Sequence, residues 1–381
     1  MKILHCCLSC FYIDNFNYQE NVLPRINKED GHEVLILAST ESMQNTGKLI
    51  YLESGEYVNN DGIKVIRVPF QSFLPLAVMK KVRAYKGVLK HINDFKPDVI
   101  LFHGASAYEI INVARYKKKH PEIKLYVDSH GYFVNTARSF LSKQILHKCI
   151  YRSCLHKALP LIDKILCISI ESMDFVHDLY KISNDKLEIY PLGGIIYEGD
   201  KYLETRTKLR NKMQLREDDV LFVHSGKMDP YKRTADLLNA FTKVASKKFR
   251  LILIGDIPEN MQNVLMPLIK SDLRIQFLGW VSSDKLMDYL CAADMYVQPG
   301  SQSVTMQNAI CCGCPVMLYP HKSHEIYLKE NGFFVQTIDD MTDAFKTIAA
   351  DPGILKDMQK ATYKVAHELL DYKKLASRLY K

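Results

Sequence analysis

The fold is decided by residues 292–316, which read AADMYVQPGSQSVTMQNAICCGCPV. A short apolar strand, Met295–Gln298, leads into a polar loop that begins with Pro299 and Gly300. A helix is predicted over Met306–Cys311, and glycine and proline then introduce another apolar strand. A strand, a loop and a helix that returns the chain to a second strand form the repeating unit of a parallel α/β sheet.

The same unit repeats along most of the chain. Its strands are continuous apolar runs rather than alternating ones, which indicates parallel sheets covered by helices on both faces. We therefore predict two doubly wound, Rossmann-like α/β domains with ligand loops at the carboxyl ends of their strands. The predicted strands are Lys2–Cys7, Glu33–Leu37, Lys64–Val68, Val99–Phe102, Lys124–Val127 and Ile165–Ile168 in the first half, and Val220–His224, Arg250–Ile254, Ile275–Leu278, Met295–Gln298 and Pro315–Tyr319 in the second.

The boundary between the domains is predicted near Ile189–Gly194, where a proline and two glycines precede a polar helical stretch. We assign residues 1–192 to the first domain and 193–362 to the second. The last helix, about 363–381, is predicted to pack back on the first domain.

Length and composition fit two globular cores, because the 381 residues are 47% apolar and 25% charged. No apolar run reaches about 18 residues, so we expect no membrane span. The apolar start Met1–His5 is short, holds a histidine and lacks a small-residue cleavage site, so we predict a first strand rather than a signal peptide. The net charge of +8 is modest, and we expect no nucleic-acid partner.

The ten cysteines do not form paired CxxC units at zinc-ribbon spacing, nor do they resemble a secreted disulfide scaffold. We interpret them as small buried residues in a reducing cytosol.

The positive charge is concentrated in two stretches. Residues 129–162 hold no acidic residue, and Lys80–Lys90 has a similar character. Two interpretations stay open: a basic amphipathic surface that binds an anionic membrane, and a solvated basic face over an ordinary core. The first stretch combines Arg138, Lys143, Lys148, Arg152 and Lys157 with Phe140, Leu141, Ile145, Leu146, Ile150 and Tyr151 at helical spacing.

Polar loops follow several strands of the second domain. Gly226 and Lys227 close one strand, and Lys232 precedes the helix that begins near Thr234, so two lysines flank a strand–loop–helix turn. A diphosphate needs cations and free N–H groups at such a turn. The chain has no Walker A motif and no GxGxxG after either first strand, which disfavours a nucleotide hydrolase or a dehydrogenase.

Taken in order, these loops resemble the family-4 retaining glycosyltransferases, whose fold is GT-B. The family's Gly-Arg-Leu-x-x-x-Lys-Gly turn is similar to Gly226–Arg233 here, with Lys227 in the arginine place and Arg233 in the last glycine place. The elements Leu253–Asp256, Gly279–Val281 and Ala292–Asp294 follow in the family's order, and Cys312–Val316 matches its small-residue turn.

The resemblance implies a GT-B fold with an interdomain cleft and a donor site in the second domain. It implies that Gly226, Lys227 and Lys232 bind the donor diphosphate. It also implies that Asp256, Trp280, Val281 and Asn308 contact the nucleoside, and that Ser301, Gln302, Ser303, Val304 and Thr305 contact the donor sugar.

One departure from the family lies in the donor loop. The family carries two glutamates at the donor helix, but no acidic residue lies between Pro299 and Asn308. The second glutamate position falls on Asn308, which can still bond ribose hydroxyls, and the first must be taken by Ser301, Gln302 or Ser303.

In the first domain, residues 126–131 end a strand and resemble the family's histidine-bearing loop. The resemblance implies that His130 reaches the donor sugar beside the scissile bond and that Asp128 orients it or contacts the acceptor. Residues 18–21 and 31–34 are similar to the opening of bacterial polysaccharide transferases, which implies acceptor-side roles for Gln19 and Glu20.

We therefore expect transfer of a sugar from a UDP- or GDP-linked donor to a saccharide or lipid-linked saccharide in surface polysaccharide biosynthesis. The expected location is cytoplasmic, with peripheral binding to the inner membrane face left open. No cofactor is expected, and no metal, since the chain lacks the Asp-x-Asp of GT-A enzymes.

Two alternatives remain: a non-catalytic GT-B subunit that binds a nucleotide sugar or a partner transferase, and a GT-B sugar-nucleotide epimerase or hydrolase. Oligomeric state is left open.

Overall fold

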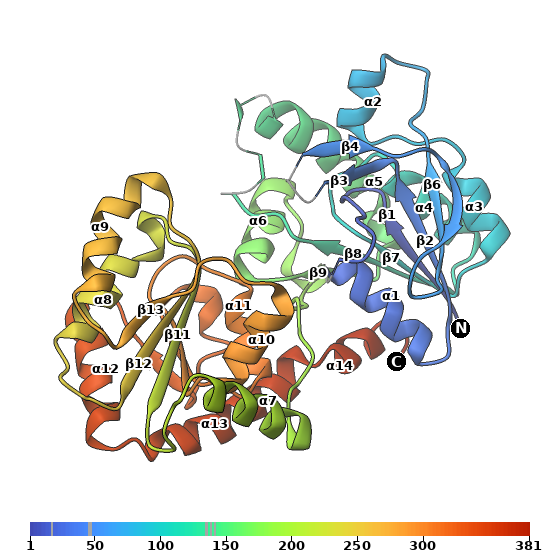
Figure 1. The fold of residues 1–381 in the computed structure, drawn as a ribbon. Helices are drawn as coiled ribbons and strands as arrows, with labels where there is room; N and C mark the ends of the chain where they lie inside the picture. Colours follow the sequence, from blue (N-terminus) through green and yellow to red (C-terminus); the bar gives the residue numbers. More distant parts are fainter. Residues whose placement is uncertain (17, 45–47, 134–135, 138, 141) are drawn as a thin grey trace. The chain divides into compact units, whose positions relative to one another are not determined.

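The computed structural model describes residues 1–16, 18–44, 48–133, 136–137, 139–140 and 142–381. Arg138 and Leu141, part of the predicted basic stretch, lie outside this description. The chain forms two compact units: the first comprises Met1–Pro191 and Tyr372–Lys381, and the second comprises Leu192–Asp371 (Figure 1). Residues 363–371, which the sequence analysis placed in the returning helix, belong to the second unit, and the return begins at Tyr372.

The first unit is built on a sheet of eight strands in the order β10-β9-β8-β7-β1-β2-β6-β5. All neighbours are parallel except β5 and β6. The six predicted strands are present, and the additional ones are short or exposed, so they carry no apolar run. The strands are β1 (Lys2–Cys7), β2 (Glu33–Ser39), β5 (Gly55–Val58), β6 (Lys64–Val68), β7 (Val99–Phe102), β8 (Lys124–Ser129), β9 (Lys164–Cys167) and β10 (Leu187–Ile189), with β3 (Glu41–Met43) and β4 (Leu49–Tyr51) as a separate antiparallel pair.

Helices cover both faces of this sheet because its strands are apolar on both sides. In β1, Leu4 packs towards one core cluster and Ile3 towards another. Helices α1 (Gln19–Glu29) and α14 (Tyr372–Ser377) lie side by side over the Ile3 face (Figure 1). The Leu4 face is covered by α3 (Val88–Phe95), α4 (Ile110–Lys119), α5 (Arg152–Ala158) and α6 (Ile170–Tyr180), with α2 (Leu76–Val82) and the π-helix η1 (Ser142–Tyr151) at its margin.

The second unit has a six-stranded, fully parallel sheet in the order β13-β12-β11-β14-β15-β16. Two core clusters lie on its two faces, one under α8, α9 and α12 and the other under α7, α10, α11 and the end of α13. The elements are α7 (Gly199–Lys212), β11 (Val220–Lys227), α8 (Thr234–Thr242), β12 (Phe249–Asp256), α9 (Glu259–Lys270), β13 (Ile275–Phe277), α10 (Ser283–Ala292), β14 (Met295–Gln298), α11 (Thr305–Cys311), β15 (Val316–Leu318), β16 (Gly332–Phe334), α12 (Ile338–Ala350), α13 (Ile354–Val365) and the π-helix η6 (Ala366–Leu370).

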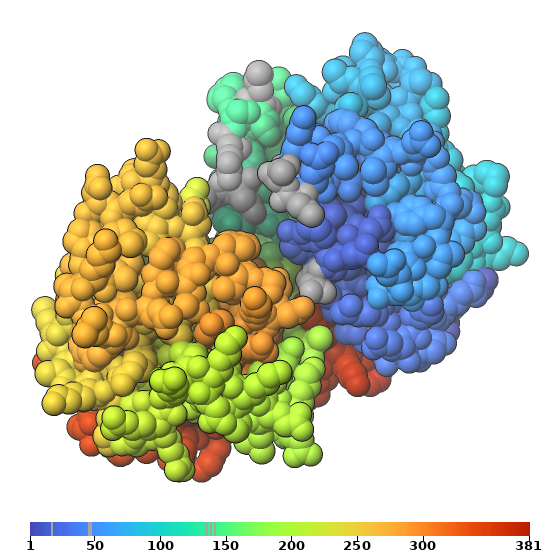
Figure 2. Space-filling model, viewed as in Figure 1, coloured from blue at the N-terminus to red at the C-terminus, as the bar shows by residue number. Residues whose placement is uncertain are grey.

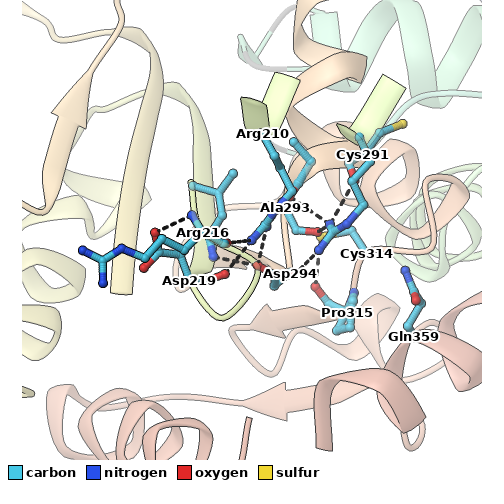
Figure 3. A network of polar contacts seen from close by, with 12 residues as sticks. Arg210, Arg216, Asp219, Cys291, Ala293, Asp294, Cys314, Pro315 and Gln359 are labelled. Carbon is cyan, nitrogen blue, oxygen red and sulfur yellow. Dashed lines mark hydrogen bonds and ion pairs between the residues drawn. The ribbon is translucent and has the colours of Figure 1, made fainter. Parts of the chain in front are cut away.

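Asp294 joins α7 to this sheet (Figure 3). Its Oδ1 accepts a hydrogen bond from Arg206 Nη2 at 2.5 Å, and its Oδ2 accepts from Arg210 Nη1 at 3.0 Å. Oδ2 also accepts from the Leu221 backbone N at 2.7 Å, at the start of β11. Both carboxylate oxygens are therefore satisfied, so the Ala292–Asp294 motif has a structural role that fixes a helix on the sheet.

In both sheets the strand order changes direction at one point. Leaving the antiparallel edge strand aside, the first sheet runs β6-β2-β1-β7-β8-β9-β10, and the second runs β13-β12-β11-β14-β15-β16. In each, the first parallel strand lies between the second and the fourth, which is the doubly wound order of a Rossmann sheet. A crevice opens outside the carboxyl ends of the strands at such a switch point. The switch points, β1/β7 and β11/β14, are therefore where ligand sites are expected.

Candidate functional site

The first unit has a cavity of about 650 Å³ at its switch point. Its walls include Ser9 and Cys10 after β1, residues 103–106 after β7, and residues 128–131 at the end of β8. Because these segments follow the carboxyl ends of parallel strands, they meet at one edge of the sheet. Two of the sequence-predicted residues, Asp128 and His130, line this cavity.

Asp128 belongs to a buried chain of polar side chains. Its Oδ2 lies 2.5 Å from His103 Nδ1, and its Oδ1 accepts a hydrogen bond from the Gly104 backbone N at 2.6 Å. His103 Nε2 lies 3.0 Å from His5 Nδ1, and His5 Nε2 lies 2.9 Å from Asn27 Oδ1. A carboxylate only accepts hydrogen bonds, so His103 carries a proton on Nδ1. Burial, with His103 nearby, lowers the pKa of His5 to about 3, so His5 is neutral.

His130 is the exposed end of this chain. Its side chain is 37% exposed, and its Nε2 lies 3.5 Å from Asp128 Oδ2. Burial alone would lower the pKa of His130, but the Asp128 carboxylate outweighs burial and raises that pKa to about 9. Burial likewise opposes ionisation of Asp128, yet His103 and His130 hold the pKa of its carboxyl well below the usual range. At neutral pH the pair is therefore a carboxylate and an imidazolium, and both residues line the cavity.

The two residues that the sequence predicts on the acceptor side, Gln19 and Glu20, differ in their surroundings. Glu20 lines the cavity, whereas the buried Gln19 donates from Nε2 to the Pro191 carbonyl at 3.1 Å. Both stand at the start of α1, where neighbouring side chains point in different directions.

Sequence reasoning missed several residues of this site. His103 directly follows the predicted strand Val99–Phe102, just as His130 follows β8, and that position was the available signal. His5 lies inside an apolar strand, and Arg83 lies at the end of α2, so neither position carries a recognisable pattern.

In the second unit, Gly226 and Lys232 pack against each other at the β11/β14 switch point. Lys232 is only 5% exposed, and its Nζ donates to the Ser301 carbonyl at 3.3 Å. A Cβ on Gly226, whose φ is +121°, would lie 2.8 Å from Lys232 Cε, so glycine makes room for this side chain. Burial lowers the pKa of Lys232 to about 8, although Asp229 opposes this. Lys227, by contrast, is exposed at the end of β11.

The predicted sugar-binding loop follows β14 and rests on the lysine loop. The Ser301 backbone N donates to the Tyr231 carbonyl at 2.8 Å, and a Cβ on Gly300 would lie 2.2 Å from the same oxygen. Ser303 Oγ bonds Thr305 Oγ1 at 3.2 Å, and Gln302 Nε2 donates to Ser323 Oγ at 2.6 Å. Hydroxyls and an amide are thus held at the start of α11.

His224 supports both loops from below. Its Nδ1 lies 2.7 Å from the Val297 carbonyl, and its Nε2 lies 2.9 Å from Thr234 Oγ1. Since a carbonyl only accepts, Nδ1 carries the proton and Nε2 accepts from the threonine. Burial lowers the pKa of His224 to about 4, so the ring is neutral and ties β11 to β14 and α8.

The predicted nucleoside contacts lie on neighbouring strand ends. Asp256 is exposed at the end of β12, Trp280 is 80% exposed after β13, and Val281 and Asn308 are half-buried. The loop after β15 was not predicted as part of the site, yet His321 Nε2 contacts the Gly300 carbonyl at 3.1 Å.

Three further observations concern the described part of the chain. All ten cysteines are free thiols. Within the described ranges, no three histidine, cysteine, aspartate or glutamate side chains are grouped in a way that would hold a metal ion. The helices in those ranges are all too short or too polar to cross a membrane.

Two family models match the chain in succession. A model described as "Glycosyltransferase Family 4" matches residues 27–193, and one described as "Glycosyl transferases group 1" matches residues 219–351. The first match lies in the unit with the His130 cavity, and the second lies in the unit with the Lys232 loop.

Curated relatives match over part of their length. N-acetyl-alpha-D-glucosaminyl L-malate synthase of Bacillus anthracis is 24% identical over 160 residues, which are 40% of this chain and 40% of that protein. Alpha-galactosylglucosyldiacylglycerol synthase of Streptococcus pneumoniae is 22% identical over 174 residues, 43% of this chain and 46% of that protein. The chain thus spans less than half the length of either relative.

Solved structures match the whole fold. Anabaena HepE in complex with UDP has a TM-score of 0.65 at 15% identity, covering 99% of this chain and 98% of that one. A glycosyltransferase from Rickettsia africae has a TM-score of 0.69 at 14% identity, covering 99% and 96%. WaaG, a glycosyltransferase involved in lipopolysaccharide biosynthesis, has a TM-score of 0.61 at 14% identity, covering 99% of each. At such identities the likeness establishes the fold, which is the predicted GT-B.

Proposed function

The chain belongs to the family-4 glycosyltransferases of the GT-B fold, and we propose that it transfers a sugar, with retention, from a nucleotide-sugar donor to a saccharide or lipid-linked saccharide. The observation that carries this proposal is Lys232, a buried cation at the switch point of the second unit. Burying an ammonium group that forms no ion pair with the described residues is costly, so a bound diphosphate would relieve a cost that the free protein bears.

The donor is a UDP- or GDP-linked sugar in this proposal, and no cofactor is required. The solved complex of HepE with UDP supports the uridine nucleotide. Lys232 and Lys227 bind the diphosphate, and Ser301–Thr305 supply hydroxyls and an amide to the sugar. Asn308 bonds the ribose as a neutral replacement for the family's glutamate, and Asp256, Trp280 and Val281 contact the nucleoside.

His130 acts as a hydrogen-bond donor in this mechanism. Its raised pKa keeps it protonated at neutral pH, so it is a poor general base there. The acceptor hydroxyl attacks the anomeric carbon as the bond from that carbon to the diphosphate breaks. The hydroxyl proton passes to a diphosphate oxygen, while His130 donates to an oxygen of the donor. Asp128 keeps the imidazolium in place.

A donor panel tests this function. UDP, GDP and ADP are compared by calorimetry, and the corresponding hexose donors are assayed for nucleotide release with saccharide acceptors. We expect one nucleotide to bind most tightly and its sugar donor to be turned over. The Lys232→Ala variant should bind that nucleotide more weakly than the wild type. Binding without turnover would instead support the non-catalytic subunit, conversion of the free donor would support the epimerase, and no binding of any nucleotide would refute the proposal.

We also propose that the first unit binds an anionic membrane surface on the inner face of the cell membrane. Helix α2 packs against η1 and projects from the first unit, light blue in Figures 1 and 2. Apolar side chains here are solvent-exposed, among them Phe140 at 76% and Phe73 at 65%. The α2 and η1 region also carries Lys80, Lys81, Lys143 and Lys148, so apolar and cationic groups share it.

Vesicle sedimentation tests the membrane proposal. Binding to vesicles with phosphatidylglycerol should exceed binding to pure phosphatidylcholine vesicles. It should fall as salt rises, because exposed charges are screened over about 8–10 Å at physiological ionic strength. Lys80→Gln with Lys148→Gln should weaken binding, and Lys118→Gln on the distant α4 should not. Equal binding to both vesicle types would remove the electrostatic part of this proposal.

A further inference from the structure

Arg83 has an unusual position on the wall of the first unit's cavity. It caps the carboxyl end of α2 with a left-handed backbone, φ 57° and ψ 61°, which a residue with a Cβ rarely adopts. Its side chain faces the cavity together with Lys80 and Lys81.

Only one edge of the Arg83 guanidinium is occupied. Nη1 donates to the Ser9 carbonyl at 2.7 Å, to Ser9 Oγ at 3.0 Å and to the Ser106 carbonyl at 3.1 Å. All three acceptors are uncharged, and no carboxylate of the described residues lies within ion-pair distance of this group. The Nε and Nη2 edge therefore keeps its donors and its charge available to a ligand.

This cation lies close to the Asp128–His130 pair. Ser9 Oγ, which accepts from Arg83, also accepts from the Ser106 backbone N at 3.1 Å. Gly104 packs on Ser9 so closely that a Cβ would lie 2.7 Å from that Oγ, and its N donates to Asp128. A short, tightly packed wall thus joins the guanidinium to the carboxylate that holds His130.

The cavity also holds acidic groups, but none of those in the described residues forms an ion pair with Arg83. Asp128 is paired with the imidazoles of His103 and His130. Glu20 and Glu41 line the cavity without forming an ion pair with the guanidinium. Arg83, Lys80 and Lys81 are three cations against the two carboxylates of Glu20 and Glu41, so this part of the cavity favours an anion.

We propose that the cavity binds the acceptor through an anionic oxygen group, a carboxylate or a phosphate, paired with the free edge of Arg83. The inference rests on the proposed transferase function and specifies its acceptor. A guanidinium edge with two parallel N–H groups matches two oxygens of either anion, whereas a neutral sugar would leave the charge uncompensated. A cavity of about 650 Å³ suits a small acid or the anionic head of a larger acceptor. The acceptor hydroxyl then lies on the Asp128–His130 side.

The test compares anionic and neutral probes. L-malate and glycerol 3-phosphate are titrated by calorimetry, with methyl glucoside as the neutral probe. We expect saturable binding of at least one anion, and Arg83→Gln should weaken it by at least about tenfold, the effect of losing a charge-assisted hydrogen bond. Arg115→Gln, an exposed arginine on α4, should change it less than about twofold. The proposal is overturned if neither soluble anion nor vesicles that contain phosphatidic acid bind, or if the wild type and Arg83→Gln bind them equally.

Two further measurements identify the source of the anion and allow for a variant that does not fold. Vesicles with phosphatidic acid present the phosphate on a lipid, so Arg83-dependent binding to vesicles but not to glycerol 3-phosphate identifies a lipid-borne acceptor. If Arg83→Gln does not fold, Arg83→Lys keeps the charge without the flat edge and should bind the anion several-fold more weakly. Equal affinity in Arg83→Lys would then overturn the guanidinium assignment.

UDP binding is measured on the same samples. If UDP binds and the anions do not, the acceptor proposal alone fails. If UDP does not bind the wild-type protein, the transferase function itself fails.

Discussion

The two switch points of the molecule share one architecture but carry different ionisable groups. In the first unit, the strand ends carry a buried carboxylate linked to imidazoles, and His130 is the partly exposed end of that chain. In the second unit, the strand ends carry a buried lysine, hydroxyls and backbone groups, with no acidic residue from Pro299 to Asn308. The first arrangement sets the protonation of His130, and the second holds a buried cation for which we propose a diphosphate ligand.

In the proposed mechanism, this difference separates the catalytic groups on one sheet from the donor-binding groups on the other. Groups that must hold a defined protonation state lie on strand ends, where packing fixes their partners. The groups that we propose for the diphosphate lie at a strand end and in the loops beside it, where Gly226 leaves room for Lys232 and Gly300 packs on the Tyr231 carbonyl. Substitutions in the two units should therefore affect different kinetic constants.

The largest expected effect is that of His130→Ala, which should lower turnover by at least about a hundredfold with little change in UDP affinity. An interaction made mainly in the transition state affects kcat more than binding. Turnover, UDP binding and melting temperature are measured on the same preparation. His120→Ala, a surface histidine of the same unit, is the control. A folded and fully active His130→Ala protein would remove the catalytic role from the first switch point.

Lys232→Ala is the converse test. Losing one charge-assisted contact costs about 1.5–3 kcal/mol, so UDP affinity should fall roughly tenfold to a hundredfold while the fold is kept. Calorimetry measures the affinity, and Lys243→Ala, an exposed lysine that follows α8, is the control. Unchanged affinity would exclude Lys232 from the diphosphate site and end the contrast between the two units.

The Asp128→Asn variant tests the first unit through the pH dependence of turnover. The carboxylate is what raises the pKa of His130, so without it burial should bring that pKa below its ordinary value of 6.5. Protonated His130 is present below its pKa and lost above it. The alkaline limit of turnover should therefore move from about 9 to below neutrality, which gives a loss of at least about tenfold at pH 8. An unmoved pH–rate profile would show that Asp128 does not control His130.

The pH dependence of UDP binding tests the role of Lys232 in the second unit, and its expected effect is the smallest of the four. The pKa of Lys232 is about 8 in the free protein because burial lowers it, and a bound diphosphate should raise it. Affinity should therefore be constant below pH 8 and fall by up to about tenfold per pH unit above it. Calorimetry in buffers of different ionisation enthalpy should detect proton uptake near pH 8. The effect should vanish in Lys232→Ala, and its persistence there would assign the proton to another group.

Most of the fold could be predicted because buried parallel strands leave a clear pattern. Val99–Phe102 is apolar on both faces, so its sequence predicts a buried strand, as do the sequences of the other central strands. Three-residue strands such as Gly332–Phe334 are too short for periodicity to be read, and the exposed edge strand Gly55–Val58 has no apolar run. The predicted helical stretch after Ser129 is a π-helix followed by an α-helix, a distinction that apolar spacing does not make.

Candidate site residues could be predicted from the sequence only where they lie at strand ends or in the loops next to them. Lys232 and His130 are such residues, and their roles stay predictions until the variants are measured. His5 looks like any polar residue inside a strand, because only the fold brings it 3.0 Å from His103, nearly a hundred positions away. Arg83 lies far from Asp128 in sequence, so its place in the same cavity depends on long-range packing.

Helix α14 has a consequence for how the protein is made. The apolar side chains Leu375, Ala376 and Leu379 complete the cluster that contains Val22, Leu23 and Ile26 of α1, and Tyr190 donates to the Leu375 carbonyl at 2.7 Å. During translation the first unit begins to fold while this face of α1 has no cover, and it stays so until the segment after Tyr372 leaves the ribosome. Such a nascent surface is a target for chaperones and a risk for aggregation. A fragment that ends at Pro191 would keep that risk permanently, so a stable version of the first unit needs residues 372–381 grafted onto its end.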